Sequence, residues 1–91
     1  MISNSSELRN LLNNRSRKEE VKELIVNEKC CNDMKDDLEI SGFENLEKIV
    51  VKKWALKNLN SLKICTNDKL KTIEIEDDAF KNVKNVMIES I

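Results

Sequence analysis

Three successive copies of one pattern make up most of this chain. The copies begin at Val21, Leu46 and Leu70, so their spacing is 25 and then 24 residues. A fixed period between about 20 and 50 residues is typical of repeat proteins, in which each unit buries its apolar edge against the next unit. We therefore expect three similar units in a stack. The shared apolar columns are Leu24, Ile49 and Ile73; Val26, Val51 and Ile75; Leu38, Leu62 and Val86; and Ile40, Ile64 and Ile88.

Each copy has the same internal order. It begins with an alternating segment, VKELIV, LEKIVV or LKTIEI, and branched residues in alternation indicate a strand with one buried face. The middle, CCNDM, ALKNL or AFKNV, spaces its apolar residues by one and then three, which favours a tight corner or one helical turn. A second alternating segment follows as DLEIS, SLKIC or NVMIE. Stacked copies would therefore form two parallel strand ladders around a thin apolar core.

Charged columns also favour the stacking of consecutive copies. Lys22, Glu47 and Lys71 share one column, and Glu39 stands beside Lys63 in another. At a spacing of about 4.8 Å between neighbouring strands these residues attract, and each exposed pair contributes roughly 0.2–1 kcal/mol. A shift by one whole copy would instead place Lys22 beside Lys71. The charges therefore support pairing between neighbouring copies.

Residues 1–20 differ from the repeats and are mostly polar. We expect a short helix whose N-cap is Ser5 or Ser6. Its apolar side would cover the open edge of the first repeat, and that side carries Leu8, Leu11 and Leu12. Two alternatives stay open, which are a disordered segment and a basic arm that contacts a partner. The basic residues of such an arm are Arg9, Arg15, Arg17 and Lys18.

The composition disfavours several classes of function. The 16 basic and 17 acidic residues leave a net charge of −1, which argues against broad electrostatic binding to nucleic acid or to acidic membranes. The chain contains no histidine, so the commonest general base and metal ligand is missing. It also lacks the run of about 20 apolar residues that crosses a bilayer, and its N-terminus lacks the apolar core of a signal peptide. We expect a cytoplasmic protein that is not an enzyme and holds no metal or cofactor.

The three cysteines are interpreted as structural residues. Their number is odd and Cys65 lies far from the other two, so the sequence implies no disulfide framework. Cys30 and Cys31 are adjacent and lack the C-x-x-C spacing of zinc sites. Both share columns with apolar residues, so we expect them in the core. Cys65 follows the second strand of its copy and is expected to be more exposed.

The aligned pattern L-x-x-I-x-I, then A-F/L-K-N-L/V, then L/V-x-I resembles a leucine-rich repeat. It is most similar to the surface-antigen-like subclass, in which each repeat carries an "aF" corner and a second strand on the convex side. The best corners are AFKNV at 79–83 and ALKNL at 55–59, and CCNDM at 30–34 is a looser version. The asparagine ladder of the commonest leucine-rich repeats is not clear. The resemblance implies a protein-binding solenoid and no catalytic residues.

Together these observations predict a β-rich α/β fold, a short leucine-rich-repeat solenoid of about three repeats with an N-terminal helical cap. Residues 1–20 would form the cap or a polar arm, and residues 21–91 the repeat domain. Its repeats are expected to span 21–45, 46–69 and 70–91. The function that the resemblance implies is a non-catalytic scaffold for protein–protein interaction, with a partner that the sequence does not identify.

Two surfaces are candidates for that interaction. Ile25 and Val50 lie between inward-facing columns, so they should point outward and form an apolar strip with Trp54, beside Lys52 and Lys53. The second surface is the far end of the stack, because no C-terminal cap is recognisable and the last repeat is expected to present a bare apolar edge. As an alternative function, this edge would join copies into a homo-oligomer or belong to a larger repeat array. Its candidate residues are Phe80, Val86, Ile88 and Ile91.

Overall fold

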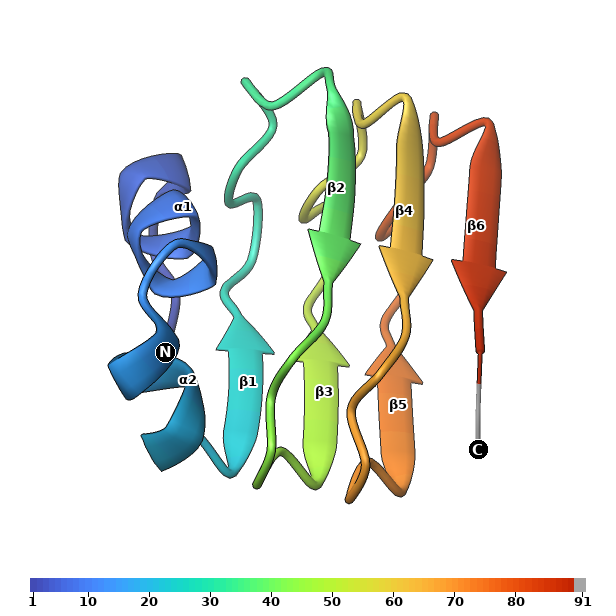
Figure 1. Cartoon of the computed structure of the whole chain (residues 1–91). Coiled ribbons are helices and arrows are strands. Elements are labelled where there is room, and N and C mark those ends of the chain that lie inside the picture. Colours follow the sequence, from blue (N-terminus) through green and yellow to red (C-terminus); the bar gives the residue numbers. More distant parts are fainter. Residues whose placement is uncertain (90–91) are drawn as a thin grey trace.

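Two short helices precede six strands in the computed structural model, which describes residues 1–89 (Figure 1). The strands form two separate three-stranded sheets with the orders β1-β3-β5 and β2-β4-β6, and every pairing is parallel. The chain is thus a short β-rich solenoid with two strands in each coil. The elements are α1 (Ser5–Leu12), α2 (Arg15–Glu20), β1 (Glu23–Val26), β2 (Asp37–Ile40), β3 (Lys48–Val51), β4 (Ser61–Ile64), β5 (Thr72–Ile75) and β6 (Asn85–Ile88).

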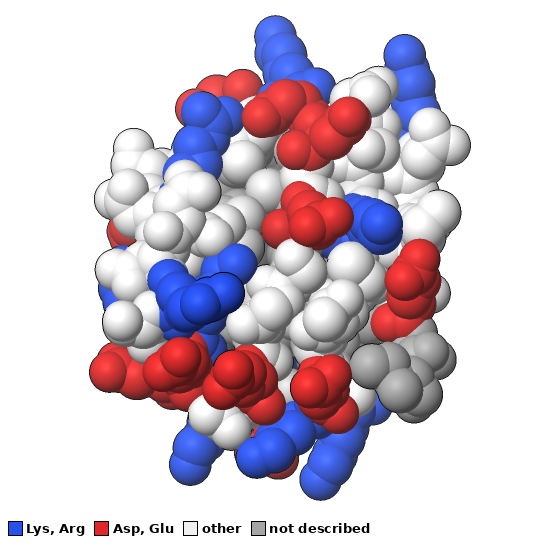
Figure 2. Space-filling model, viewed as in Figure 1, with Lys and Arg blue, Asp and Glu red and all other residues white. Residues whose placement is uncertain are grey.

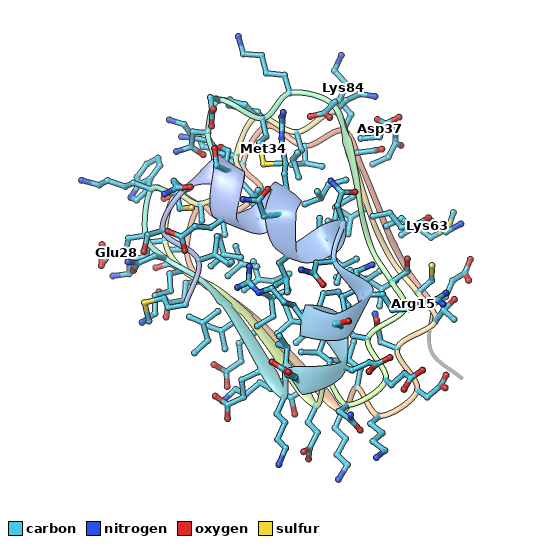
Figure 3. The ribbon with its side chains drawn as sticks, turned by 60° about the vertical axis from the view of Figure 1, so that its left-hand side comes forward. Arg15, Glu28, Met34, Asp37, Lys63 and Lys84 are labelled. Atoms are coloured by element: carbon cyan, nitrogen blue, oxygen red, sulfur yellow. The ribbon has the colours of Figure 1, made fainter. Side chains whose placement is uncertain are left out.

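The strand register confirms the columns read from the sequence. In the first sheet Leu24 pairs with Ile49, which pairs with Ile73. In the second sheet Ile40 pairs with Ile64, and the ladder continues into β6. These residues point inward, and the view along the stack in Figure 3 shows the two ladders on opposite sides of a filled interior. The core therefore consists of one apolar layer from each coil.

Each corner between the two strands contains two residues with a left-handed backbone. The first is Lys29, Trp54 or Asp78 and the second is Cys31, Leu56 or Phe80, with φ between 52° and 65° in all six. A residue with a β carbon loses about 1–2 kcal/mol in this conformation. Cys31 and Leu56 are buried in the core, and this burial offsets the backbone cost. The middle of each repeat is therefore a corner and not a helical turn.

Asparagine side chains connect one corner to the next. The Asn32 amide donates to the carbonyl oxygen of Trp54 at 2.9 Å and accepts from the backbone N–H of Lys57 at 3.0 Å. Asn58 donates to the carbonyl oxygen of Asn32, and Asn82 donates to the side-chain oxygen of Asn58, both at 3.0 Å. The corners thus have an asparagine ladder of their own, which the sequence analysis did not recognise.

A buried asparagine connects the segments that follow the second strands. Asn67 donates to the carbonyl oxygen of Ile40 at 3.0 Å and accepts from the backbone N–H of Phe43 at 3.1 Å. Both ends of the amide are satisfied, so its burial carries no unpaired polar group. Gly42 and Thr66 precede these two linkers and both have a positive φ. The linkers therefore repeat as regularly as the corners.

The N-terminal cap is helical, as expected, but its N-cap lies one or two residues before the predicted Ser5 or Ser6. Asn4 is the N-cap of α1, and its side-chain oxygen accepts from the backbone N–H of Glu7 at 2.9 Å. The Asn4 amide also donates to the Glu7 carboxylate at 3.1 Å, a reciprocal contact of the capping-box kind. Ser5 is already helical and its hydroxyl donates to Asp33 instead. Ser6 also lies inside the helix.

Helix α1 covers the first coil with its apolar side. Leu8 and Leu11 are buried in the common core, while Leu12 is half-buried against it. The polar helix α2 follows and was not predicted as a separate element. Its Lys18 ammonium donates to the carbonyl oxygen of Ser41 at 3.0 Å and lies 5.3 Å from the centre of the Phe43 ring. Figure 1 shows both helices across the N-terminal end of the stack.

The segment before α1 closes the open edge of the first sheet. The backbone N–H of Ile2 donates to the carbonyl oxygen of Ile25 at 2.7 Å, and the carbonyl oxygen of Ile2 accepts from the N–H of Asn27 at 2.8 Å. Ile2 thus forms a parallel bridge with Val26 and its side chain is buried. Strand β1 therefore has hydrogen-bond partners on both sides.

Ion pairs follow the predicted columns only in part. Lys71 reaches Glu47 at 3.9 Å, as the column arrangement predicts. Lys48 instead pairs diagonally with Glu74 at 3.3 Å. Within residues 1–89 no ion pair joins Glu39 to Lys63. Lys48 is half-buried and the other side chains of these pairs are exposed, so the apolar layers contribute more to stability than the charges do.

We expect the Leu8→Ala substitution to lower the free energy of unfolding by about 2–5 kcal/mol, because it removes a fully buried side chain between α1 and the first coil. The matched change Leu12→Ala, at a half-buried position of the same helix, should lower the free energy of unfolding clearly less. Urea unfolding followed by circular dichroism measures both values. Equal and small losses would show that α1 does not cover the repeats.

Candidate functional site

The third coil exposes the apolar residues that the first two coils bury. Val86 is 47 % exposed and Ile88 is 49 % exposed, whereas their partners Leu62 and Ile64 are each 1 % exposed. We call this surface the apolar end and define it by Ile75, Val86, Met87 and Ile88, which apart from Met1 are the large exposed apolar residues of the described chain. Val86 and Ile88 are edge residues predicted from the sequence, whereas Ile75 and Met87 were not among the predicted ones.

The apolar end also presents unpaired strand edges. Strand β5 pairs with β3, and β6 pairs with β4. Among residues 1–89 no strand pairs with the outer edge of either one, and Figure 1 shows β6 as the last element of its row. Free strand edges offer backbone donors and acceptors to another strand. This end of the stack thus combines exposed apolar side chains with unused backbone hydrogen-bonding groups.

A small hollow lies between the two edge strands. It measures about 160 Å³ and its lining includes Leu70, Ile73 and Ile88. Phe80 and Val83 pack partly against the core behind the corner, so Phe80 contributes less to the surface than predicted from the sequence. Ile91, the remaining predicted edge residue, lies outside the described residues. The hollow is small for a ligand of drug size, which needs about 300–1,000 Å³.

The predicted strip on the first sheet differs from the expectation at Val50. Val50 is only 8 % exposed, so it offers little contact surface. It lies on the central strand β3 and is in register with Ile25 on one side and Glu74 on the other. Ile25 itself is half-buried, so this strip exposes less apolar surface than the sequence predicted.

Trp54 lies at the second corner, outside the core, as predicted. It is half-buried, and the ammonium groups of Lys57 and Lys81 lie 5.7 Å and 5.1 Å from its ring centre. These cation–π contacts each contribute roughly 0.5–1 kcal/mol at an exposed site. Lys81 belongs to the next coil, so Trp54 links two corners. The contacts of Trp54 are therefore explained by packing between neighbouring coils.

Lys52 and Lys53 follow β3 beside the acidic segment of the next coil. The backbone N–H of Lys53 donates to the carboxylate of Glu76 at 3.3 Å. Lys52 is half-buried and Lys53 is exposed. Figure 2 shows charges of both signs interspersed over the face that it presents. Charges of both signs at this spacing are typical of a solvated surface.

The three cysteines are buried, which confirms the prediction for Cys30 and Cys31 and corrects it for Cys65. The Sγ atoms of Cys30 and Cys31 are 2.6 Å apart. Burial raises the pKa of both thiols, and it raises the pKa of Cys31 to about 12. A buried thiol with a raised pKa is a poor nucleophile. Within residues 1–89 no group of three or more His, Cys, Asp or Glu side chains is arranged to hold a metal ion.

A larger, open hollow of about 680 Å³ lies at the opposite end, between α2 and the linkers. Its lining includes Arg15, Lys18, Glu44 and Asp68. Lys18 is already bonded to Ser41, and the remaining charges are of both signs. Arg9, another member of the predicted basic arm, pairs with Asp36 at 3.7 Å. The cap therefore uses part of its basic set for its own contacts with the repeats.

No protein-family model, curated protein or solved structure matches the chain. In the described part of the chain, the helices are too short and too polar to cross a membrane.

A matched pair of substitutions tests the difference between buried and exposed columns. We expect Ile64→Val to lower the free energy of unfolding by about 1 kcal/mol, because it removes a methylene group from a filled core. Ile88→Val removes the same methylene group from the same column at the apolar end. In dilute solution this change should leave the free energy of unfolding almost unchanged. Urea unfolding of the two variants provides the comparison. Similar costs would show that β6 is covered in solution.

The thiols should be protected in the folded protein. At pH 8 a pKa of about 12 in place of 9.0 lowers the thiolate fraction of Cys31 about a thousandfold. We expect slow reaction of all three cysteines with a chromogenic disulfide reagent in buffer and fast reaction in urea, which serves as the control. Rapid reaction of one equivalent in buffer would show that one of these thiols is accessible.

Proposed function

We propose that this protein is a non-catalytic protein-interaction module of the leucine-rich-repeat type and that it binds through its apolar end. The observation that carries the proposal is the contrast within one column, in which Ile64 is buried and Ile88 is half exposed. A coil of a solenoid gains stability when a further apolar layer covers each of its sides. The third coil has such a layer on one side, so its other side favours contact with a further apolar, strand-bearing chain.

The arrangement of each repeat supports the leucine-rich-repeat assignment. Every coil has a first strand, a corner and a second strand, and the corners recur with the same pair of left-handed residues. In such solenoids the repeats serve as scaffolds and the surfaces between or beside them serve as binding sites. The chemistry of the apolar end fits a protein partner better than a small molecule, because its hollow is small and its exposed groups are aliphatic.

An amphiphilic dye that fluoresces on apolar surfaces tests whether the end is available for binding. We expect dilute wild-type protein to bind the dye and the Val86→Lys variant to lose most of the signal, since it introduces a charge into the apolar end. Val86 is exposed enough for a lysine to reach solvent, so the fold should persist, which circular dichroism verifies.

Ile25→Lys is the matched control on the strand face. It should leave the dye signal largely unchanged, because Ile25 lies away from the apolar end. If Ile25→Lys removes the signal and Val86→Lys does not, the contact surface is the face of the first sheet. A wild-type protein that binds no dye and protects its β6 amides from hydrogen exchange at high dilution would have a covered end, and the proposal would be wrong.

A further inference from the structure

We propose that the occupant of the apolar end is a second copy of this chain, which pairs with the first copy antiparallel along the outer edge of β6. This inference rests on the proposed function and identifies its partner. In the resulting dimer the two second sheets would form one six-stranded sheet with the order β2-β4-β6-β6-β4-β2. The two β6 strands would lie side by side at its centre.

The opposite end of the stack restricts how two copies can meet. Ile2 occupies the outer edge of β1, and α1 buries Leu8 and Leu11 over the first coil. A head-to-tail arrangement would have to displace this cap before the apolar end of one copy could reach the first coil of another. Two apolar ends can meet without any such change. Contact between identical surfaces requires a twofold axis and produces a closed dimer rather than a fibre.

The residues of β6 are self-complementary in an antiparallel pairing. If the twofold axis passes beside Met87, then Val86 lies opposite Ile88 of the other copy, and both point into the core. Asn85 would lie opposite Glu89, which pairs an amide donor with a carboxylate acceptor. Strand β6 itself carries no charged residue. The net charge of −1 adds little repulsion between the two copies.

Strand β5 is less suitable for the same contact. An axis beside Glu74 would bring two carboxylates directly opposite each other, and like charges in this position are destabilising. An axis beside Ile73 would place Lys71 opposite the apolar side chain of Ile75. In addition, Lys48 already pairs with Glu74 at 3.3 Å. The charges of β5 therefore favour contact through β6.

The outward-facing column of the second sheet provides an independent sign. It contains Glu39, Lys63 and Met87 in successive strands, and Figure 3 shows Lys63 pointing away from the interior. Charged residues thus occupy this column in two coils, and an apolar one occupies it at the edge. Met87 is 53 % exposed, and in a monomer a charged residue would serve equally well at this position. Two methionines beside a twofold axis would cover each other, and the flexible thioether adapts well to such contacts.

Disulfide trapping tests the arrangement directly. In the proposed dimer the two Met87 Cα atoms lie about 4.5–5.5 Å apart, which is within the range of a disulfide. We therefore expect Met87→Cys to form covalent dimers under mild oxidation. Lys63→Cys is the matched control, because it exposes a thiol on the same face one strand further in. Its two copies would be roughly 14 Å apart, at three strand spacings, and should stay unlinked.

Sedimentation of the wild type and of Met87→Lys completes the test. The wild type should become dimeric as its concentration rises, and Met87→Lys should remain monomeric, since two ammonium groups would face each other. Its fold should persist, because the other coils carry charged residues at this position. Equal trapping of both cysteine variants would indicate random collision and would refute the inference, as would a wild type that is monomeric at every concentration.

The test separates this inference from the proposed function. If the dye binds at the apolar end but Met87→Cys does not cross-link, the end is a contact surface for a different chain, and only the inference of a second copy fails. If Glu74→Cys cross-links and Met87→Cys does not, the copies meet through β5 and the assignment to β6 fails. If the end binds no dye and is protected at high dilution, both proposals fail.

Discussion

Every coil of this protein depends on its neighbour, because the inward residues of one coil form a single layer that is too thin to exclude water alone. Leu24, Ile49 and Ile73 form one continuous row through the stack, and Ile40, Ile64 and Ile88 form another. Both rows are fully buried in the first two coils and become partly exposed only in the last coil. The corners with two left-handed residues and the amide contacts between them are tolerable only because stacking supplies the compensating free energy.

The two ends of the stack differ in how the outermost coil is covered. At the first coil, residues 1–20 supply a backbone partner for β1 and an apolar helix face for the interior. At the third coil, the described chain supplies neither. The asymmetry matters for function, since a repeat protein with one covered end and one open end has a single preferred direction for association. The proposed interaction through the apolar end rests on this difference between the two ends.

Much of this fold can be predicted from the sequence because side chains on a strand alternate with a period of two. A slip of one residue would expose every apolar column, so the register is strongly determined. Local details are harder to predict. Asn4, Ser5 and Ser6 are all good N-caps, and only the backbone shows which one ends the extended segment. The outward position of Val50 in its strand likewise does not reveal that its side chain is almost fully buried.

The candidate site could be predicted in part. Val86 and Ile88 stand out because they continue buried columns past the last neighbour. Met87 is hidden from the same reasoning, since it belongs to an outward column whose earlier members are charged. Cys65 is the opposite case, because it is buried although it lies just beyond a strand, in a linker that shows no apolar periodicity.

The lower burial of the last coil also sets the order in which the coils open. Opening the third coil costs few buried contacts, whereas opening the first requires the loss of α1 and of the Ile2 bridge as well. Fluctuations of the native state should therefore begin at β6 and β5 and move inward one coil at a time. A partner at that end would stabilise the last coil, and its departure would leave that coil as the first part of the chain to open.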